Sequence, residues 1–190
     1  MIQSRNYLHL LGGVDIDSKR YGKNPHPWAQ KPNLRRDEKE FNTTEEYMAM
    51  GLPIIGVCRG AQLLCIANGG ELWQDSLEHH ASHNLQTKDG IIPNAEAGHH
   101  QVMRLDKIPK EEYEIIAWCP FKSTVYDEDD TPHILEAAPE VVWFPKTKSL
   151  AIQPHPEWAS YGTPFRTWID NLVKEYTGQE NIFDFYHSYL

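Results

Sequence analysis

Short apolar runs alternate with helical stretches in the first third of the chain. Residues 6–12 predict a strand that stops at a pair of glycines, and residues 37–50 predict a helix that ends before a glycine and a proline. A compact apolar run over 53–57 predicts a strand covered on both faces, and the apolar stretch from there to Ala67 predicts a second helix. This order of strand, helix, strand and helix favours an α/β fold around a mostly parallel sheet.

The pattern is less regular in the middle of the chain. Residues 71–112 mix short strand candidates with polar loops. Further strands are predicted near 113–118, over 134–144 and over 148–153, because apolar and β-branched residues gather there. The last of these leads directly into a proline-rich segment.

The C-terminal helix has the clearest signals. Thr163 is expected to cap it and Pro164 to occupy its first turn. Apolar side chains recur along one face at helical spacing, and these are Phe165, Trp168, Ile169, Leu172, Val173 and Tyr176. The aromatic tail over 182–190 is expected to dock on the domain.

Composition and charge narrow the class of protein. The chain has 190 residues, enough for one buried core, so we expect a single domain over 1–190. A net charge of −9 argues against binding to nucleic acid, which needs clustered lysine and arginine. We expect no membrane association, because no run of eighteen apolar residues and no convincing signal peptide occur. Three cysteines without CxxC spacing suggest a reducing, cytoplasmic setting.

One of the three cysteines stands in a distinctive place. Gly56-Val-Cys58-Arg-Gly60 lies where the apolar strand turns into a helix, which is the cysteine form of a nucleophile elbow. Small residues suit such a tight turn, and the helix N-terminus favours the thiolate form of the sulfur. The alternative for Cys58 is a buried thiol with only a structural role. We favour that interpretation for Cys65 and Cys119.

A base and a group to orient it follow near the C-terminus. His155 and Glu157 are two residues apart in the segment QPHPEW, and the flanking prolines enforce an extended backbone. Residues at i and i+2 of an extended chain project to the same side, so the carboxylate can orient the imidazole. We therefore predict that Cys58, His155 and Glu157 form a catalytic triad.

An oxyanion that forms during attack needs two N–H donors. The backbone amide of Arg59, directly after the nucleophile, is the first candidate. Gly12 and Gly13, at the end of the first predicted strand, are the natural source of the second.

A group of histidines leaves one alternative open. His79 and His83 would meet on one face if residues 78–83 were helical, and with Glu78 and His80 they could bind a metal ion. We favour the interpretation that these residues lie at the surface or at a pocket rim with their hydrogen bonds satisfied, since no third type of metal ligand stands at a recognisable spacing.

Four segments resemble one known family, the class I glutamine amidotransferases, in the branch of stand-alone γ-glutamyl hydrolases such as γ-glutamyl-γ-aminobutyrate hydrolase. They are 53–62 (PIIGVCRGAQ), 68–75 (NGGELWQD), 98–101 (GHHQ) and 152–158 (IQPHPEW). The resemblance implies a flavodoxin-like three-layer sandwich, shortened at its N-terminus because the family usually carries a further strand–helix–strand–helix region there.

The resemblance also implies an activity. Cys58, His155 and Glu157 would hydrolyse a γ-glutamyl amide through a thioester, and Gln62 with His99, His100 and Gln101 would bind the glutamyl end. The implied substrate is a small γ-glutamyl compound, and neither a metal nor an organic cofactor is implied.

Two other functions remain open from the sequence. The chain could be a glutaminase subunit that supplies ammonia to a separate synthetase or amidoligase, or it could be a binding module without activity. An esterase of the α/β-hydrolase type is disfavoured because its acid precedes its histidine in the chain. The short N-terminus and the apolar tail favour self-association into a homo-oligomer.

Overall fold

Three parallel strands form the centre of the protein. In the computed structural model, which describes residues 1–184, these strands are β2 (Leu8–Leu10), β3 (Ile54–Val57) and β13 (Ser149–Ile152). β3 lies between the other two and runs parallel to both. Because parallel strands end at the same edge of a sheet, the segments that follow β2, β3 and β13 are brought together.

The remaining strands extend this centre and add two small sheets. The large sheet has the order β1-β2-β3-β13-β12-β9-β6-β7, and its outer pairs are antiparallel. Its other members are β1 (Ile2–Gln3), β6 (His83–Thr87), β7 (Gly90–Ala95), β9 (Glu114–Trp118) and β12 (Pro139–Phe144). A three-stranded sheet contains β5 (Asp75–Ser76), β10 (Ser123–Tyr126) and β11 (Pro132–Leu135), and β4 (Glu71–Trp73) pairs with β8 (Val102–Arg104).

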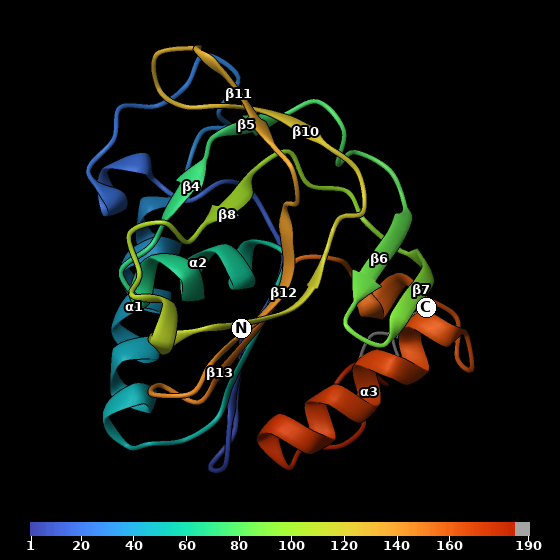
Figure 1. The fold of residues 1–190 in the computed structure, drawn as a ribbon. Coiled ribbons are helices and arrows are strands. Elements are labelled where there is room, and N and C mark those ends of the chain that lie inside the picture. Colours follow the sequence, from blue (N-terminus) through green and yellow to red (C-terminus); the bar gives the residue numbers. More distant parts are fainter. Residues whose placement is uncertain (185–190) are drawn as a thin grey trace.

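Helices cover both faces of the large sheet, as Figure 1 shows. The helices α1 (Leu34–Ala49) and α2 (Arg59–Ala67) lie on one face, and α3 (Pro164–Thr177) lies on the other. Three short 3-10 turns cover Ser18–Tyr21, Lys110–Glu112 and Pro156–Trp158. The predicted three-layer α/β arrangement is therefore confirmed. None of the helices within residues 1–184 is long and apolar enough to cross a bilayer.

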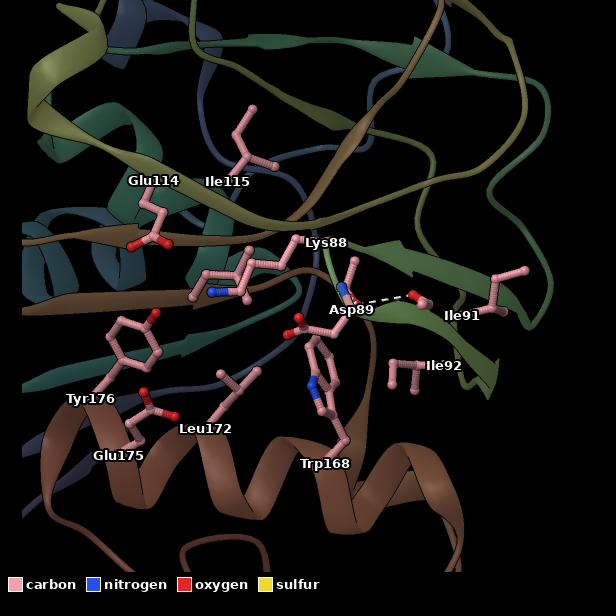
Figure 2. Close-up of a pocket in the computed structure, with 13 residues that line it drawn as sticks. Lys88, Asp89, Ile91, Ile92, Glu114, Ile115, Trp168, Leu172, Glu175 and Tyr176 are labelled. Carbon is pink, nitrogen blue, oxygen red and sulfur yellow. Dashed lines mark hydrogen bonds between the residues drawn. The ribbon is translucent and has the colours of Figure 1, made fainter.

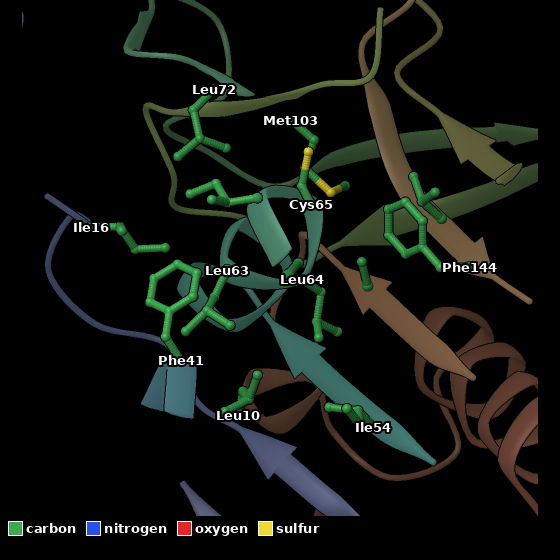
Figure 3. Close-up of a cluster of buried hydrophobic side chains, with 14 of the residues drawn as sticks. Leu10, Ile16, Phe41, Ile54, Leu63, Leu64, Cys65, Leu72, Met103 and Phe144 are labelled. Atoms are coloured by element: carbon green, nitrogen blue, oxygen red, sulfur yellow. The ribbon is translucent and has the colours of Figure 1, made fainter. Parts of the chain in front are cut away.

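The alternating side chains of β3 divide the core into two apolar clusters. Ile54 belongs to the cluster beneath α1 and α2, which also contains Phe41, Leu64 and Phe144 (Figure 3). Ile55 points the other way and belongs to the cluster under α3. Side chains of a strand point alternately to its two faces, so a strand buried on both faces reads as a continuous apolar run.

Most of the predicted elements are present with small shifts at their ends. The helix predicted over 37–50 begins at Leu34, because the side chain of Asn33 accepts a hydrogen bond from the Arg36 amide and caps it. The helix predicted after Thr163 is confirmed, and Thr163 caps it in the same way.

Two predictions on strands differ from the structure. The single strand predicted over 134–144 is wrong, since β11 and β12 belong to different sheets and the segment between them turns away. The parallel pairing expected for most of the sheet is confined to its three central strands. Short hairpin turns join β1 to β2, β6 to β7 and β12 to β13, and such turns allow only antiparallel pairing.

The aromatic tail is described only in part. Ile182 and Phe183 are buried in the cluster under α3, as predicted for the start of the tail. The rest of that prediction, over 185–190, lies outside the described residues.

Candidate active site

Cys58 occupies the sharp turn between β3 and α2. Its backbone has φ 51° and ψ −107°, a region that residues with a side chain rarely adopt. The Cys58 amide donates to the Ile152 carbonyl at 2.8 Å, and the Cys58 carbonyl accepts from the Gln62 amide at 3.1 Å. These bonds tie the strained residue to β13 on one side and to α2 on the other.

Two glycines make this turn possible. A Cβ added at Gly56 would lie 2.4 Å from the carbonyl oxygen of Gly60, and one added at Gly60 would lie 2.5 Å from the carbonyl oxygen of Leu10. Both contacts are with backbone, which cannot rotate away. The elbow predicted from the GxCxG spacing is therefore present, and α2 packs directly against β2 and β3 because of it.

His155 and Glu157 follow the end of β13, beside the elbow. His155 Nδ1 lies 2.8 Å from Glu157 Oε1, and the Trp158 ring stacks on the imidazole with 3.6 Å between centroids and 4° between planes. The His155 amide also donates to the Glu96 carbonyl at 2.6 Å. The side chain and the backbone of His155 are thus both fixed.

The electrostatics of the imidazole depend on its two partners. Burial disfavours the imidazolium, but the side-chain interactions with Cys58 and with Glu157 outweigh it and raise the pKa of His155 from 6.5 to about 9. The structure therefore brings the three residues of the predicted triad together. An imidazolium beside a thiolate can protonate a leaving group, and the neutral imidazole can accept a proton from water.

The predicted oxyanion donors lie at the same edge. Arg59 is the first residue of α2, where backbone N–H groups have no acceptor within the helix. Gly12 faces the site, since a Cβ added to it would lie 3.0 Å from His155 Cε1 and 3.7 Å from Cys58 Cβ. Gly13 instead faces the guanidinium of Arg36. The structure thus places Gly12 closer to the triad than Gly13.

The side chain of Arg59 has a role that the sequence analysis missed. It is 1% exposed and forms ion pairs with Asp37 and Glu40 of α1. The sequence carries a signal for this network, because the two carboxylates stand three residues apart on one helix. A charged residue in the first turn of an otherwise apolar buried helix also needs partners of opposite charge.

Three of the four residues predicted to bind the glutamyl end are turned inward. Gln62 Nε2 donates to the Gln101 carbonyl at 3.3 Å, and Gln101 Nε2 donates to the Gln74 carbonyl at 3.4 Å. His99 Nδ1 lies 3.0 Å from the Gln101 carbonyl oxygen, and burial lowers the pKa of His99. All three side chains are buried, at most 4% exposed.

His100 is the fourth, and together with His99 it lines an open cavity. Its two ring nitrogens lie 3.0 Å from Asp15 Oδ1 and 2.9 Å from Asp75 Oδ1. The hydrogen bond to Asp15 is the largest of several effects that raise the pKa of His100 to about 9, so it is an imidazolium at neutral pH. The cavity has a volume of about 530 Å³, and Trp28 and Gly98 are among its other lining residues.

Gly98 links the cavity to the triad. A Cβ added at Gly98 would lie 3.2 Å from the Trp158 ring, and Trp158 is the residue that stacks on His155. The wall of the cavity therefore touches the residue that positions the imidazole.

Another cavity lies far along the sheet, between the β6–β7 hairpin, β9 and α3 (Figure 2). It has a volume of about 420 Å³, and the apolar stripe of α3 contributes Trp168, Leu172 and Tyr176 to its wall. No residue of the predicted triad lines it. We therefore place the candidate active site at the elbow.

The remaining cysteines and histidines have other surroundings. Burial raises the pKa of the Cys65 thiol to about 12 and that of the Cys119 thiol to about 11, which fits their structural assignment. His79 and His83 do not lie on a helix, as the metal alternative had assumed, but both face the buried carboxylate of Glu140. A lone acidic residue in the apolar strand β12 is a signal that the sequence analysis missed.

Comparisons with known proteins identify the family of the chain. A model of the peptidase C26 family matches residues 1–115. A "Putative glutamine amidotransferase" of Mycobacterium tuberculosis is 39% identical over 74 residues, which cover 39% of this chain and 24% of that protein. A "Putative glutamine amidotransferase-like protein" of Lactococcus lactis is 30% identical over 127 residues, which cover 53% of this chain and 54% of that protein. The chain thus spans about a quarter and about half of these two relatives.

Superposition on a solved structure confirms the fold. The crystal structure of a "putative gmp synthase subunit a protein" from Thermoplasma acidophilum superposes with a TM-score of 0.52 and 13% identity, covering 92% of this chain and 97% of that one. The family model matches more than half of the chain and includes the elbow that holds Cys58. This chain belongs to the peptidase C26 family, a group of class I glutamine amidotransferase-like proteins.

Proposed function

We propose that this protein is a cysteine-dependent hydrolase of γ-glutamyl amide bonds. The observation that supports the proposal is the pairing of Cys58, held in a strained elbow, with an imidazole that Glu157 fixes from its other side. Membership of a family whose relatives are described as amidotransferases supports amide chemistry.

The proposed first half-reaction transfers the glutamyl group to sulfur. The Cys58 thiolate attacks the γ-carbonyl carbon, and a C–S bond forms while the carbonyl oxygen becomes an oxyanion. The His155 imidazolium then gives its proton to the departing nitrogen, so the C–N bond breaks and a free amine or ammonia leaves. In the second half-reaction, neutral His155 takes a proton from water, which attacks the thioester, releases glutamate and restores the thiolate.

We propose that the amides of Arg59 and Gly12 stabilise the oxyanion in both steps. Arg59 lies at the N-terminus of α2, and Gly12 contacts both reacting residues. Loss of one such donor costs about 3 kcal/mol of transition-state stabilisation. Of the residues assigned to the glutamyl end, His100 is the best placed. An imidazolium beside Asp75 offers one charge for the α-carboxylate of the substrate and one for its α-ammonium group.

The test is a screen of γ-glutamyl amides for glutamate release, run with wild-type protein, Cys58→Ala and Cys65→Ala. We expect Cys58→Ala to lower kcat at least about 10⁴-fold while the protein stays folded. Cys65→Ala is the matched control, because it removes a buried thiol that lies in the core away from the triad. Full activity in the Cys58→Ala protein would refute the proposed mechanism.

The same screen distinguishes the alternative function. A glutaminase subunit that feeds a synthetase or amidoligase would hydrolyse free glutamine, and its rate would rise when the partner is added. A stand-alone hydrolase would instead release glutamate from one γ-glutamyl amine at a rate that no added protein changes.

A further inference from the structure

A buried cluster of imidazoles around one carboxylate lies outside the proposed triad. His79 precedes β6, His99 follows β7, and Glu140 belongs to β12. His79 and Glu140 are fully buried and His99 is 4% exposed. One ligand atom from each of the three lies within 4.8 Å of the others, so three distant segments meet at this point.

In each of the two histidines, the ring nitrogen that points away from Glu140 forms a hydrogen bond. His79 Nε2 lies 2.8 Å from Ser123 Oγ, and His99 Nδ1 lies 3.0 Å from the Gln101 carbonyl oxygen. A carbonyl oxygen only accepts, so the proton of neutral His99 is on Nδ1 and a lone pair is on Nε2. Such an outer hydrogen bond is the one that orients histidines which bind a metal.

The inner atoms of the cluster face one another at ion-pair distance. His79 Nδ1 lies 2.9 Å from Glu140 Oε1, and His99 Nε2 lies 3.5 Å from Glu140 Oε2. Within residues 1–184, His79 Nδ1, His99 Nε2 and Glu140 Oε2 are buried and make no hydrogen bond of good geometry. Buried polar atoms without partners are costly, and three that converge on one point call for a shared partner.

We propose that His79, His99 and Glu140 bind a zinc ion. Two imidazole nitrogens and a carboxylate oxygen are ligands that zinc prefers, and a tetrahedral site with bonds of about 2.1 Å spaces its ligand atoms about 3.4 Å apart. The observed separations are 2.9 Å from His79 to Oε1 and 3.5 Å from His99 to Oε2, so each imidazole faces a different oxygen of the carboxylate. His83 would hold the carboxylate in place, since its Nε2 lies 3.2 Å from Glu140 Oε1.

The ion would stiffen the support of the candidate active site. The Glu140 carbonyl accepts a hydrogen bond from the Gln153 amide at 2.8 Å, two residues before His155. The Glu96 carbonyl, three residues before His99, accepts from the His155 amide itself. A zinc ion at this place would join the two segments that hold the imidazole, and none of the triad residues would bind it.

The experiment measures zinc directly on the full chain. Wild-type protein and the variants Glu140→Gln, His99→Gln and His80→Gln are stripped with a chelator, and zinc binding is then measured by competition with a chromogenic chelator and by elemental analysis. His80→Gln is the matched control, since His80 is exposed and adjoins His79 in the chain. We expect about one zinc per chain for wild type and for His80→Gln, with affinity at least about a hundredfold weaker in the two ligand variants.

The melting temperature gives a second readout on wild-type protein alone. Zinc should raise it and the chelator should lower it, because a ligand that binds only the folded state stabilises that state. Wild-type protein that takes up no zinc and melts at the same temperature with zinc and with chelator would overturn the proposal. Equal loss of zinc in His80→Gln would also overturn it. Neither result depends on whether γ-glutamyl amides are hydrolysed.

Discussion

The substitution Glu157→Gln separates the charge of the carboxylate from its place in the site. Glutamine has nearly the same shape, so its oxygen can still accept a hydrogen bond from His155 Nδ1 and hold the ring in position. The negative charge is gone, however. Any change in the titration of His155 then reports the electrostatic contribution of Glu157 and not a loss of orientation.

The magnitude of the effect follows from the two partners of the imidazole. Raising the pKa of His155 from 6.5 to about 9 corresponds to about 3 kcal/mol in favour of the imidazolium. That is a net value, because burial acts in the opposite direction and only Cys58 and Glu157 overcome it. Without the carboxylate, only the interactions with Cys58 oppose burial, so we expect the pKa of His155 to fall by at least about one unit.

The assay is a proton–carbon NMR titration of protein labelled at histidine Cε1, with the His155 signal assigned by its loss in His155→Asn. Glu96→Gln is the matched control: the backbone of Glu96 contacts His155, but its carboxylate is bonded to Ser82. We expect the control to titrate near pH 9 and Glu157→Gln well below it. An unchanged pKa in Glu157→Gln, or an equal fall in the control, would refute the electrostatic reasoning.

The same shift has a consequence for stability. Because the folded-state pKa of His155 lies above its unfolded value, its stabilising interactions are complete below about pH 6.5 and are lost as pH rises through about 9. We expect the wild-type free energy of unfolding to decline over that window. The decline should be smaller in Glu157→Gln, because its imidazolium is stabilised less in the folded state.

Three further predictions concern the residues around the elbow. Gly56→Ala should lower the free energy of unfolding by about 3 kcal/mol or more, measured by urea denaturation, because its methyl would lie 2.4 Å from a backbone oxygen of α2. Arg59→Met should lower it by about 3–5 kcal/mol, because the buried carboxylate of Asp37 loses its cationic partner while Glu40 keeps Arg36, and adding Asp37→Asn should restore part of the loss. Trp158→Ala should lower kcat for a γ-glutamyl amide and Trp158→Phe should retain most of it, because the stacked ring holds His155 in place.

The parts of the fold that could be predicted are those whose signals are local. The buried strand before Cys58, the glycines of the elbow and the capped C-terminal helix each carry their own pattern, and each is present. The proximity of His155 to Cys58 also followed from local patterns, because both were placed at the ends of parallel strands. Parallel strands end at one edge, so two local predictions fixed one long-range contact.

The features that could not be predicted depend on partners far away in the sequence. Nothing near His99 indicates that its ring turns inward to Glu140, forty-one positions away in the chain and on another strand. A charged side chain at Arg59 signals a need for anionic partners, but the local sequence does not show that these lie on α1. The break between β11 and β12 was missed because strand propensity continues across it, while the choice of sheet is made by tertiary packing.

The three parallel strands act as one unit that explains both the strain and the chemistry of the site. Cys58 holds a backbone conformation that costs about 1–3 kcal/mol, and such strain persists only where surrounding structure enforces it. Here the enforcing bonds run to Ile152 and to Gln62, so the same contact that strains the nucleophile also aligns β13 and delivers His155. Gly12 follows β2 on the other side of β3. The proposed nucleophile, base and oxyanion donor therefore come from the ends of adjacent strands, and their spacing is set by the hydrogen bonds of the sheet itself.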